Sequence, residues 1–531
     1  KIMQAIILAA GMGKRLKELT SNATKCMVEV NGEMMIHKTL MHLEKLNLNK
    51  IVLVVGYEGQ QLMDYVNSLG LKTPVEYVVN NIYSLYLAKE YLLQDDTLLL
   101  ESDLVYEEAV IRKLVDTPYP SLVLVDKFES WMDGTCITVD EDDNITSFVS
   151  KREFDFTKTD EYYKTVNLYK FSKNFSEKYY VPFLEAYCNA MGLNEYYEQV
   201  LKVITFLGDL EIKAVKLNGE KWYEIDDVQD LDIAESLLAG KEEKLEKMQK
   251  RFGGYWRYPK LIDFCYLVNP YFPNKKLVSE MQTNFERLLG EYPSGMGVNS
   301  LIAAKIFGLH ASQVIVGNGA AELIKSLMER FTGRLGMAFP TFQEYPNRKA
   351  EKDVVPYFVT NDEFRYTAKD LMDFYEDKDI EVLTLINPDN PSGNYIRRED
   401  VLKLSEWCEK KNIRFVVDES FVDFVDEEET TTLLDAGILK ANPNLIVVKS
   451  ISKSYGVPGL RLGVLASSDE ELIAEMKKDV AIWNINSFAE FYLQIYEKYA
   501  KDYAKAIEKF KQTRAAYIKD LQALSGLRVL P

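Results

Sequence analysis

The sequence predicts an α/β protein with two domains in series. Its 531 residues are more than one hydrophobic core usually holds. Short apolar runs alternate with amphipathic segments, and this alternation begins again after a charge-rich segment near residue 240. Such alternation indicates a mostly parallel sheet covered by helices. We therefore expect one domain over residues 1–240 and another over 241–531, with the boundary at about 240–255.

Buried strands of the first domain are predicted by four apolar runs, at residues 4–10, 50–55, 97–102 and 121–126. Residues 35–48 and 59–70 have apolar side chains at helical spacing, which predicts helices between those strands. The run 239–254 is rich in Lys and Glu and ends in two glycines. It predicts a solvated helix that closes the first domain.

The second half repeats this pattern. Residues 313–331 predict a strand, a tight glycine turn and a helix. Three further strands run into polar loops, within residues 381–393, 413–420 and 444–456. Because function in open α/β sheets gathers at the carboxyl ends of strands, these loops hold candidate site residues. Residues 499–524 predict a long helix.

Composition excludes several classes of function. A net charge of −18 argues against binding to nucleic acid. No run of eighteen apolar residues and no signal segment is found, so we expect no membrane insertion and a cytoplasmic enzyme. Five Cys without a CxxC pair and three scattered His argue against disulfides or a zinc centre. Catalysis is expected to use Lys, Asp, a carboxylate-bound metal or a cofactor.

The string LAAGMGKRL, residues 8–16, follows the first predicted strand. Gly11 and Gly13 would let backbone N–H groups turn toward a polyphosphate, and Arg15 and Lys25 would add positive charge. A glycine pair after a strand is, taken alone, as often a plain turn. The string matches neither the Walker loop nor the full dinucleotide fingerprint.

Together with V-x-V-N-G at 28–32, the string resembles the Rossmann-like nucleoside-triphosphate transferases of the sugar-nucleotide type. Thr24 stands where those families carry Pro, and NGEMMI replaces their G-K-P-L-I. Later strings resemble the choline-phosphate cytidylyltransferase subgroup, namely those at 80–92, 101–106, 131–135, 162–172 and 222–231. The resemblance covers residues 3–235 and implies transfer of a nucleotidyl group from CTP.

The resemblance implies roles for particular residues. Those expected to bind the nucleotide are Leu8, Ala10, Gly11, Gly13, Lys25 and Ser102. Lys25 and Arg15 would be catalytic, since attack on the α-phosphorus brings negative charges together. Asp103 and Asp226 match the Mg²⁺-binding positions of the family, with Asp227 as an open alternative. Without the resemblance, an Asp at a strand end would be read as a cap or turn.

An acceptor that carries an amine would need its own recognition. Trp131, Asp133 and Glu153 are the candidates for this role. Aromatic faces suit a quaternary ammonium, whereas carboxylates suit a primary ammonium, which has hydrogens to donate. A core Trp beside a turn Asp is the alternative interpretation.

The string NPDNPSG, residues 387–393, resembles the N-P-x-N-P-(T/S)-G loop of the fold-type I aminotransferases that use pyridoxal phosphate. Four other strings agree in order, at 316–324, 340–345, 416–420 and 450–463. The resemblance implies that Lys453 forms the Schiff base with the cofactor and moves the proton. Asp418 would pair with the pyridine nitrogen, Asn390 with the phenolic oxygen, and Phe342 would stack on the ring.

Phosphate contacts of the cofactor are expected from Gly319, Ala320, Ser450, Ser452 and Arg461. Tyr292 matches a family Tyr that reaches the cofactor of a partner subunit, which implies a homodimer through this domain. Phe421 stands where many relatives carry a Tyr, so one hydrogen bond to the phenolic oxygen is expected to be lost. The family's small C-terminal lobe is expected to be absent. Histidinol-phosphate aminotransferases and threonine-phosphate decarboxylases show the greatest resemblance.

The two halves together resemble the bifunctional enzymes of phosphonate biosynthesis that form an aminophosphonate and activate it. The expected steps are transamination of phosphonoacetaldehyde by an amino donor, and then CTP-dependent formation of CMP-2-aminoethylphosphonate. Three alternatives stay open. The front domain could activate phosphocholine or phosphoethanolamine beside an unrelated rear enzyme. The rear domain could be a decarboxylase of a phosphorylated or phosphono-amino acid, or an inactive scaffold for dimerisation.

Overall fold

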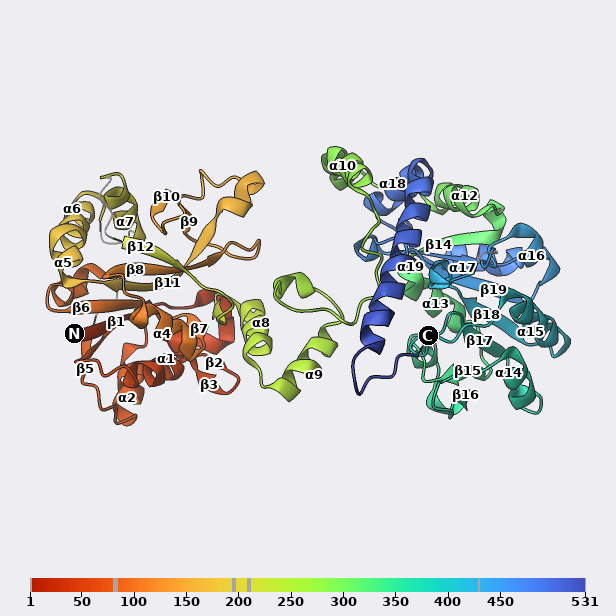
Figure 1. Ribbon diagram of the computed structural model, residues 1–531, viewed down its shortest axis with the longest axis horizontal. Helices are drawn as coiled ribbons and strands as arrows, with labels where there is room; N and C mark the ends of the chain where they lie inside the picture. The colour runs from red at the N-terminus through yellow and green to blue at the C-terminus, as the bar shows by residue number, and fades with distance from the viewer. Residues whose placement is uncertain (1, 80–84, 193–196, 208–211, 428–429, 531) are drawn as a thin grey trace. The chain divides into compact units, whose positions relative to one another are not determined.

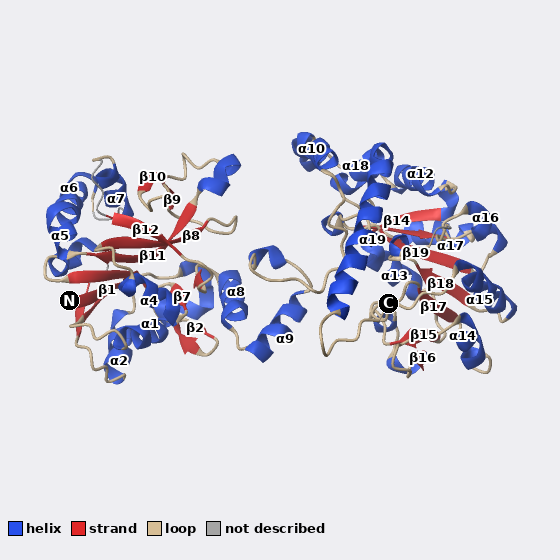
Figure 2. Ribbon diagram, in the orientation of Figure 1, coloured by secondary structure: helices blue, strands red, loops and turns tan. Residues whose placement is uncertain are grey.

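The computed structural model describes residues 2–79, 85–192, 197–207, 212–427 and 430–530. The chain divides into two compact units, Lys1–Ile262 and Asp263–Pro531 (Figure 1). Part of the string at 80–92, which supported the cytidylyltransferase resemblance, lies outside the described residues. Both units are α/β, with helices packed on a central sheet (Figure 2).

Unit 1 contains a nine-stranded sheet in which β10-β9-β11-β6-β1-β4-β5 follow one another and β8 pairs with β11 and β12. The strands are β1 (Met3–Ala9), β4 (Ile51–Val55), β5 (Val75–Val79), β6 (Asp96–Glu101), β8 (Ser121–Lys127), β9 (Cys136–Val139), β10 (Ile145–Val149), β11 (Tyr163–Phe171) and β12 (Ile212–Lys216). All four strands predicted from apolar runs are present.

The expectation of a mostly parallel sheet is wrong for unit 1, because β11 runs antiparallel to β6, β8 and β9. Strands β9 and β10 also pair antiparallel, because residues 140–144 between them are too few for the crossover that a parallel pair requires. The parallel pairs of the sheet are those among β1, β4, β5 and β6, and the pair of β8 with β12.

Helices cover both faces of this sheet, as the alternation of buried residues along β1 requires. Ala5, Ile7 and Ala9 pack in a cluster with α1 (Met35–Glu44), α2 (Gly59–Ser68) and α4 (Glu108–Asp116). Ile6 and Leu8 pack in another cluster with α6 (Val181–Met191) and α7 (Glu198–Thr205). The carboxyl end of β1 is therefore held rigidly between two hydrophobic cores.

The division between the units falls after Ile262, beyond the boundary expected at about 240–255. The charge-rich segment forms α9 (Lys241–Arg251), which follows α8 (Val228–Leu238). Met248 of α9 is buried in a cluster with Tyr223, Ile225, Ile233 and Tyr258. Met248 on this mostly polar helix and Tyr258 beyond it thus join residues 241–262 to unit 1.

Unit 2 contains a seven-stranded sheet in the order β14-β20-β19-β18-β17-β15-β16, in which β20 is antiparallel to both neighbours. The strands are β14 (Val314–Asn318), β15 (Leu335–Phe339), β16 (Val354–Phe358), β17 (Val382–Ile386), β18 (Arg414–Asp418), β19 (Leu445–Ser450) and β20 (Leu462–Ala466). The carboxyl ends of β17, β18 and β19 lie side by side, since Ile386 is in register with Asp418, and Asp418 with Val448.

Helices again cover both faces of the unit 2 sheet. One face packs against α13 (Gly319–Met328) and α17 (Glu470–Asp479). The other face packs against α12 (Met296–Phe307), α14 (Ala368–Tyr375), α15 (Arg398–Lys410), α16 (Ala436–Ala441) and α18 (Ser487–Ile495). The predicted long terminal helix is α19 (Ala500–Gln522). No described helix is long and apolar enough to cross a membrane.

We expect Met248→Ala to destabilise unit 1 by about 2–4 kcal/mol, because it removes a buried side chain from the cluster that holds α9. Leu245→Ala is the matched control, since Leu245 lies on the same helix and is 63% exposed. Its effect should stay within about 0.5 kcal/mol. Hydrogen exchange of the amides in α8 and in β13 (Trp222–Glu224) under urea measures both effects. Equal effects of the two substitutions would show that α9 does not stabilise unit 1.

Candidate active sites

The glycine loop of unit 1 lies at the carboxyl end of β1 and packs against Lys25. Gly13 adopts a left-handed conformation with φ 60°, and a Cβ there would lie 3.0 Å from Cγ of Lys25. The backbone N–H of Lys25 donates to the carbonyl of Gly11 at 3.2 Å. A side chain at Gly13 would therefore displace Lys25. The loop and the lysine form one structural element, as the sequence motif implied.

Three carboxylates converge beside this loop. The short antiparallel strands β7 (Leu104–Tyr106) and β13 (Trp222–Glu224) place Glu224 opposite Leu104. Ile225 donates to the carbonyl of Asp103 at 2.9 Å. Carboxylate oxygens of Asp103, Glu224 and Asp226 consequently lie within 4.8 Å of one another. Hard carboxylate oxygens in this arrangement fit a Mg²⁺ ion that also keeps phosphate and water ligands.

Asp103 and Asp226 were predicted from the sequence, but Glu224 was not. Its signal was present in the spacing E-x-D of WYEIDD, because residues two apart on an extended chain point to the same side. Asp227, the open alternative, caps α8 by accepting from Gln229 and Asp230. Burial, together with Asp103 and Asp226, raises the pKa of Glu224 to about 7 against the opposing effect of Lys164.

The ammonium of Lys25 lies between the carboxylates. Its Nζ is 2.7 Å from Oδ2 of Asp103 and 2.7 Å from Oδ1 of Asp226. Arg15 adds a second cation, with Nη2 3.1 Å from the same oxygen of Asp226. Burial disfavours charge on Lys25, but the two carboxylates outweigh it and raise the pKa of the amine. Both predicted catalytic cations thus contact the predicted metal ligands directly.

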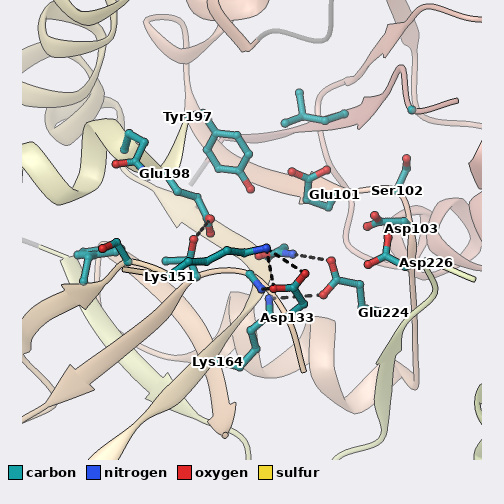
Figure 3. Close-up of a pocket in the computed structure, with 18 of the residues that line it drawn as sticks. Glu101, Ser102, Asp103, Asp133, Lys151, Lys164, Tyr197, Glu198, Glu224 and Asp226 are labelled. Atoms are coloured by element: carbon teal, nitrogen blue, oxygen red, sulfur yellow. Dashed lines mark hydrogen bonds and ion pairs between the residues drawn. The ribbon is translucent and has the colours of Figure 1, made fainter. Parts of the chain in front are cut away.

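A cavity of about 1040 Å³ opens over this cluster (Figure 3). The predicted residues that line it are Leu8, Gly11, Gly13, Arg15, Lys25, Ser102, Asp103, Asp133 and Asp226. Ala10 is buried and is not among the lining residues. The volume suits a nucleoside triphosphate together with a small acceptor.

The three residues proposed for acceptor binding do not converge. Asp133 lines the cavity, and Lys151 pairs with its carboxylate at 3.0 Å (Figure 3). Glu153 lies outside the lining and accepts from Ser150 and from Lys202 at 3.0 Å. Trp131 lines a separate cavity of about 450 Å³. Its ring stacks on Tyr223 with a centroid separation of 4.3 Å.

Glu198 is a cavity residue that the sequence interpretation missed. It begins α7, is only 9% exposed, and accepts hydrogen bonds from Thr135, Tyr169 and, at 3.1 Å, Thr165. Nearby, Lys164 is almost wholly buried and lies 3.4 Å from Oε2 of Glu224 (Figure 3). Burial opposes the charge on Lys164, yet Glu224 and Glu198 raise its pKa. No local motif marks Glu198, because only the packing of α7 brings it to the cavity.

In unit 2, Asp418 ends β18 as a fully buried carboxylate. Its Oδ1 accepts from the backbone N–H and hydroxyl of Ser420, at 3.0 and 2.6 Å. The hydroxyl of Tyr345 donates to Oδ2 at 2.8 Å. Burial raises the pKa of Asp418, while Ser420 and Tyr345 oppose that shift. Tyr345 was missed, although it lies three residues beyond the predicted Phe342.

Lys453 follows β19, next to the strand that ends at Asp418. Burial and the nearby charge of Arg461 lower the pKa of Lys453, and Asp418 partly offsets this effect. A lowered pKa increases the fraction of neutral amine, the form that attacks a carbonyl carbon. The pair of Lys453 and Asp418 therefore fits a bound pyridoxal group in the roles expected of them.

Unit 2 also holds a fitting cradle for a phosphate. Gly319 begins α13 with φ 74°, and a Cβ there would lie 2.4 Å from Nη2 of Arg461. The hydroxyl of Ser452 is buried without a partner among the described residues. Ser450 accepts from the backbone N–H of Ser452 at 3.2 Å. A helix N-terminus, a guanidinium and an unpartnered hydroxyl together suit a phosphate dianion. Ala320 follows Gly319 in the first turn of α13.

Three other predicted residues lie in loops of unit 2. Asn390 is half-buried in the loop after β17, and Phe342 follows β15 with 42% of its surface exposed. Tyr292 is 79% exposed and stacks on Trp483 with a centroid separation of 4.4 Å. Phe421 follows Ser420 directly and carries no hydroxyl to donate. The described contacts connect none of these four side chains with Lys453.

Comparison with known families agrees with both sites. The chain matches Aminotransferase class I and II over residues 263–531 and the MobA-like NTP transferase domain over residues 5–132. The first family uses pyridoxal phosphate, and the second typically uses Mg²⁺, which confirms the two expected cofactors. The chain is therefore an enzyme with a nucleotidyltransferase unit followed by an aminotransferase unit of fold type I.

Individual relatives cover the whole chain or one half of it. A CMP-5'-(3-aminopropyl)phosphonate synthase of Streptomyces rubellomurinus is 30% identical over 100% of this chain and 84% of its own length. An L-serine phosphate decarboxylase of Sulfurospirillum multivorans is 31% identical over 50% of this chain and 69% of its own. The solved CTP:phosphocholine cytidylyltransferase of Streptococcus pneumoniae is 25% identical over 47% of this chain and 100% of its own, with a TM-score of 0.38.

We expect Lys25→Met to tighten Mn²⁺ binding in the absence of nucleotide by about tenfold or more. The ammonium now holds the carboxylates of Asp103 and Asp226, so an ion must displace it before it can bind. Titration of Mn²⁺ followed by electron paramagnetic resonance measures the affinity. Lys151→Met, which removes an exposed cation paired with Asp133, is the control and should change little. Unchanged or weaker binding by Lys25→Met would contradict competition for the same oxygens.

Proposed function

We propose that this chain forms an aminoalkylphosphonate and activates it with CTP. The chain belongs to the class I and II aminotransferases and carries a MobA-like NTP transferase domain ahead of the aminotransferase domain. The observation that carries the proposal is similarity to CMP-5'-(3-aminopropyl)phosphonate synthase along the entire chain, across both units. Consecutive steps give a reason for the fusion, because the amine made by one unit is the acceptor of the other.

In unit 1, an oxygen of the phosphonate attacks the α-phosphorus of CTP, and pyrophosphate leaves. A Mg²⁺ ion held by Asp103, Glu224 and Asp226 would offset the charge that gathers on the phosphates. Lys25 and Arg15 exchange their carboxylate partners for phosphate oxygens of the nucleotide. Leu8, Gly11, Gly13 and Ser102 lie along the cavity wall where the nucleotide would bind.

The ammonium group of the acceptor is assigned to Glu198 in this proposal, in place of Glu153. Glu198 is a buried carboxylate on the cavity wall, whereas Glu153 is exposed and already paired with Lys202. A primary ammonium donates hydrogen bonds to a carboxylate, which a quaternary ammonium cannot do. Lys164, Lys151 and Lys202 line the same cavity and supply positive charge for the phosphonate. These contacts favour an acceptor with a primary ammonium, and the acceptor that we propose is 2-aminoethylphosphonate.

In unit 2, the proposed reaction transfers an amino group from an amino acid donor to phosphonoacetaldehyde, giving 2-aminoethylphosphonate and a keto acid. When bound, pyridoxal phosphate supplies the electron sink for this exchange. Asp418 holds the pyridine nitrogen protonated, Lys453 moves the proton at the amine-bearing carbon, and Arg461 with Ser452 binds the phosphate. Tyr292 is exposed on unit 2, as expected for a residue that reaches a partner subunit in a homodimer.

Decarboxylation is the second candidate for unit 2. It is favoured by the 31% identity with an L-serine phosphate decarboxylase over half of this chain. In that case a phosphono-amino acid would lose CO₂ to give the amine, and no amino acceptor would be consumed. Release of ¹⁴CO₂ from a carboxyl-labelled phosphono-amino acid distinguishes this reaction from transamination, which leaves the carbon skeleton of the donor intact.

We expect Asp103→Ala to lower nucleotidyl transfer by at least about 100-fold and to leave amine formation unchanged. Lys453→Ala should abolish amine formation and leave nucleotidyl transfer unchanged. Pyrophosphate release and amine production are measured separately on the full chain. Each variant serves as the control for the other. Loss of both activities in a folded variant would contradict two independent active sites.

A further inference from the structure

Arg257 lies in the segment between α9 and the start of unit 2, in the 3-10 helix η6 (Tyr255–Arg257). Its Nη2 donates to the hydroxyl of Tyr223 at 2.8 Å and lies 3.4 Å from Oδ1 of Asp230. The guanidinium also lies over the ring of Trp131, 5.5 Å from its centroid. The side chains of Arg257 and Asp230 are each only 16% exposed. This cation is therefore tightly placed rather than a solvated surface charge.

Asp230 connects Arg257 with the metal-binding turn. Its Oδ2 accepts from the backbone N–H groups of Asp226 and Asp227, at 3.1 and 3.2 Å. Asp226 provides one of the three clustered carboxylates. One oxygen of Asp230 thus faces Arg257 while the other fixes the backbone that carries Asp226. The same Arg257 contacts Tyr223, which directly precedes Glu224, another member of the cluster.

We infer that Arg257 is a positioning residue for the metal-binding carboxylates, acting through Asp230 on Asp226 and through Tyr223 on Glu224. One oxygen of Asp230 faces the guanidinium of Arg257, and this contact fixes the orientation in which the other oxygen accepts both amide hydrogens. Without Arg257, the turn at residues 226–227 loses this restraint, and the three oxygens no longer converge as well on one ion.

This inference also explains Trp131, which was expected to bind the acceptor. The ring of Trp131 stacks on Tyr223 and also lies under the guanidinium of Arg257, so it helps to hold the arginine in place. Residues 255–262 thereby contribute to the nucleotidyltransferase site, although the sequence placed them beyond its boundary. Arg257 is six positions before Asp263, where unit 2 begins.

The test is Arg257→Gln in the full chain, with Mn²⁺ affinity measured by electron paramagnetic resonance in the presence of a non-hydrolysable CTP analogue. We expect the affinity to fall about tenfold or more, as for other partners that orient metal ligands. The KM for Mg²⁺ should rise, while kcat at saturating Mg²⁺ changes less than the KM. Arg257→Lys keeps the charge and should restore part of the affinity.

Arg251→Gln is the matched control. Arg251 of α9 is 18% exposed and pairs with Asp232, which lies in α8 as Asp230 does. Its guanidinium lies over the ring of Tyr258, 5.2 Å from the centroid. It resembles Arg257 in burial and pairing, but its described partners do not hold Asp226. Its substitution should change Mn²⁺ affinity by less than about twofold. An equal loss in both variants would show general destabilisation and overturn the inference.

Asp230→Asn gives a second route if Arg257→Gln folds poorly. It should weaken Mn²⁺ binding to a similar extent. The double variant should lose little more Mn²⁺ affinity than either single variant, because Arg257 and Asp230 act on Asp226 through the same contact.

The inference rests on the proposed function only for the identity of the metal cluster. If wild type binds no Mn²⁺ with the nucleotide, the proposed site fails and the inference with it. If wild type binds and the variants at positions 230 and 257 bind equally well, the inference alone fails.

Discussion

Mutual repulsion of three carboxylates is the constraint on which unit 1 depends. Asp103, Glu224 and Asp226 have oxygens within 4.8 Å of one another, so the fold must supply positive charge at that point. Arg15 of the glycine loop and Lys25, which packs against that loop, supply it. This explains why Gly13 has no room for a side chain beside Lys25. The same cations are those that a triphosphate would attract, so one arrangement both balances the charge of the carboxylates and suits the nucleotide.

In unit 2 the electrostatic constraint is burial of isolated charged groups, rather than repulsion among clustered carboxylates. Here single charged groups are buried, and burial alone raises the pKa of Asp418 and contributes to lowering that of Lys453. Both sites collect local charge at the carboxyl ends of strands, in a chain whose net charge is −18. Anionic substrates are therefore bound by short-range contacts rather than by attraction over a long distance.

The sequence was sufficient for strands and for motifs whose residues are close in the chain. Apolar runs predicted the most buried strands. The glycine loop and Lys453 lie in sequence motifs that resemble those of known families. Glu198 and Tyr345 could not be found in this way, because their roles depend on which elements pack together. Trp131 and Asp133 were proposed together from one short string, yet these two residues line different cavities. Unit 1 extends beyond the expected boundary because Met248 and Tyr258 are buried in its core cluster, despite the polar character of α9.

The central claim is that unit 1 activates the kind of amine that unit 2 makes. The direct measurement is the kcat/KM of pyrophosphate release from CTP and Mg²⁺ with 2-aminoethylphosphonate, 3-aminopropylphosphonate, phosphoethanolamine and phosphocholine in parallel. A carboxylate such as Glu198 can accept hydrogen bonds from a primary ammonium, so we expect an aminophosphonate to exceed phosphocholine by at least about tenfold. A preference for phosphocholine would contradict the claim, because transamination cannot produce a quaternary amine.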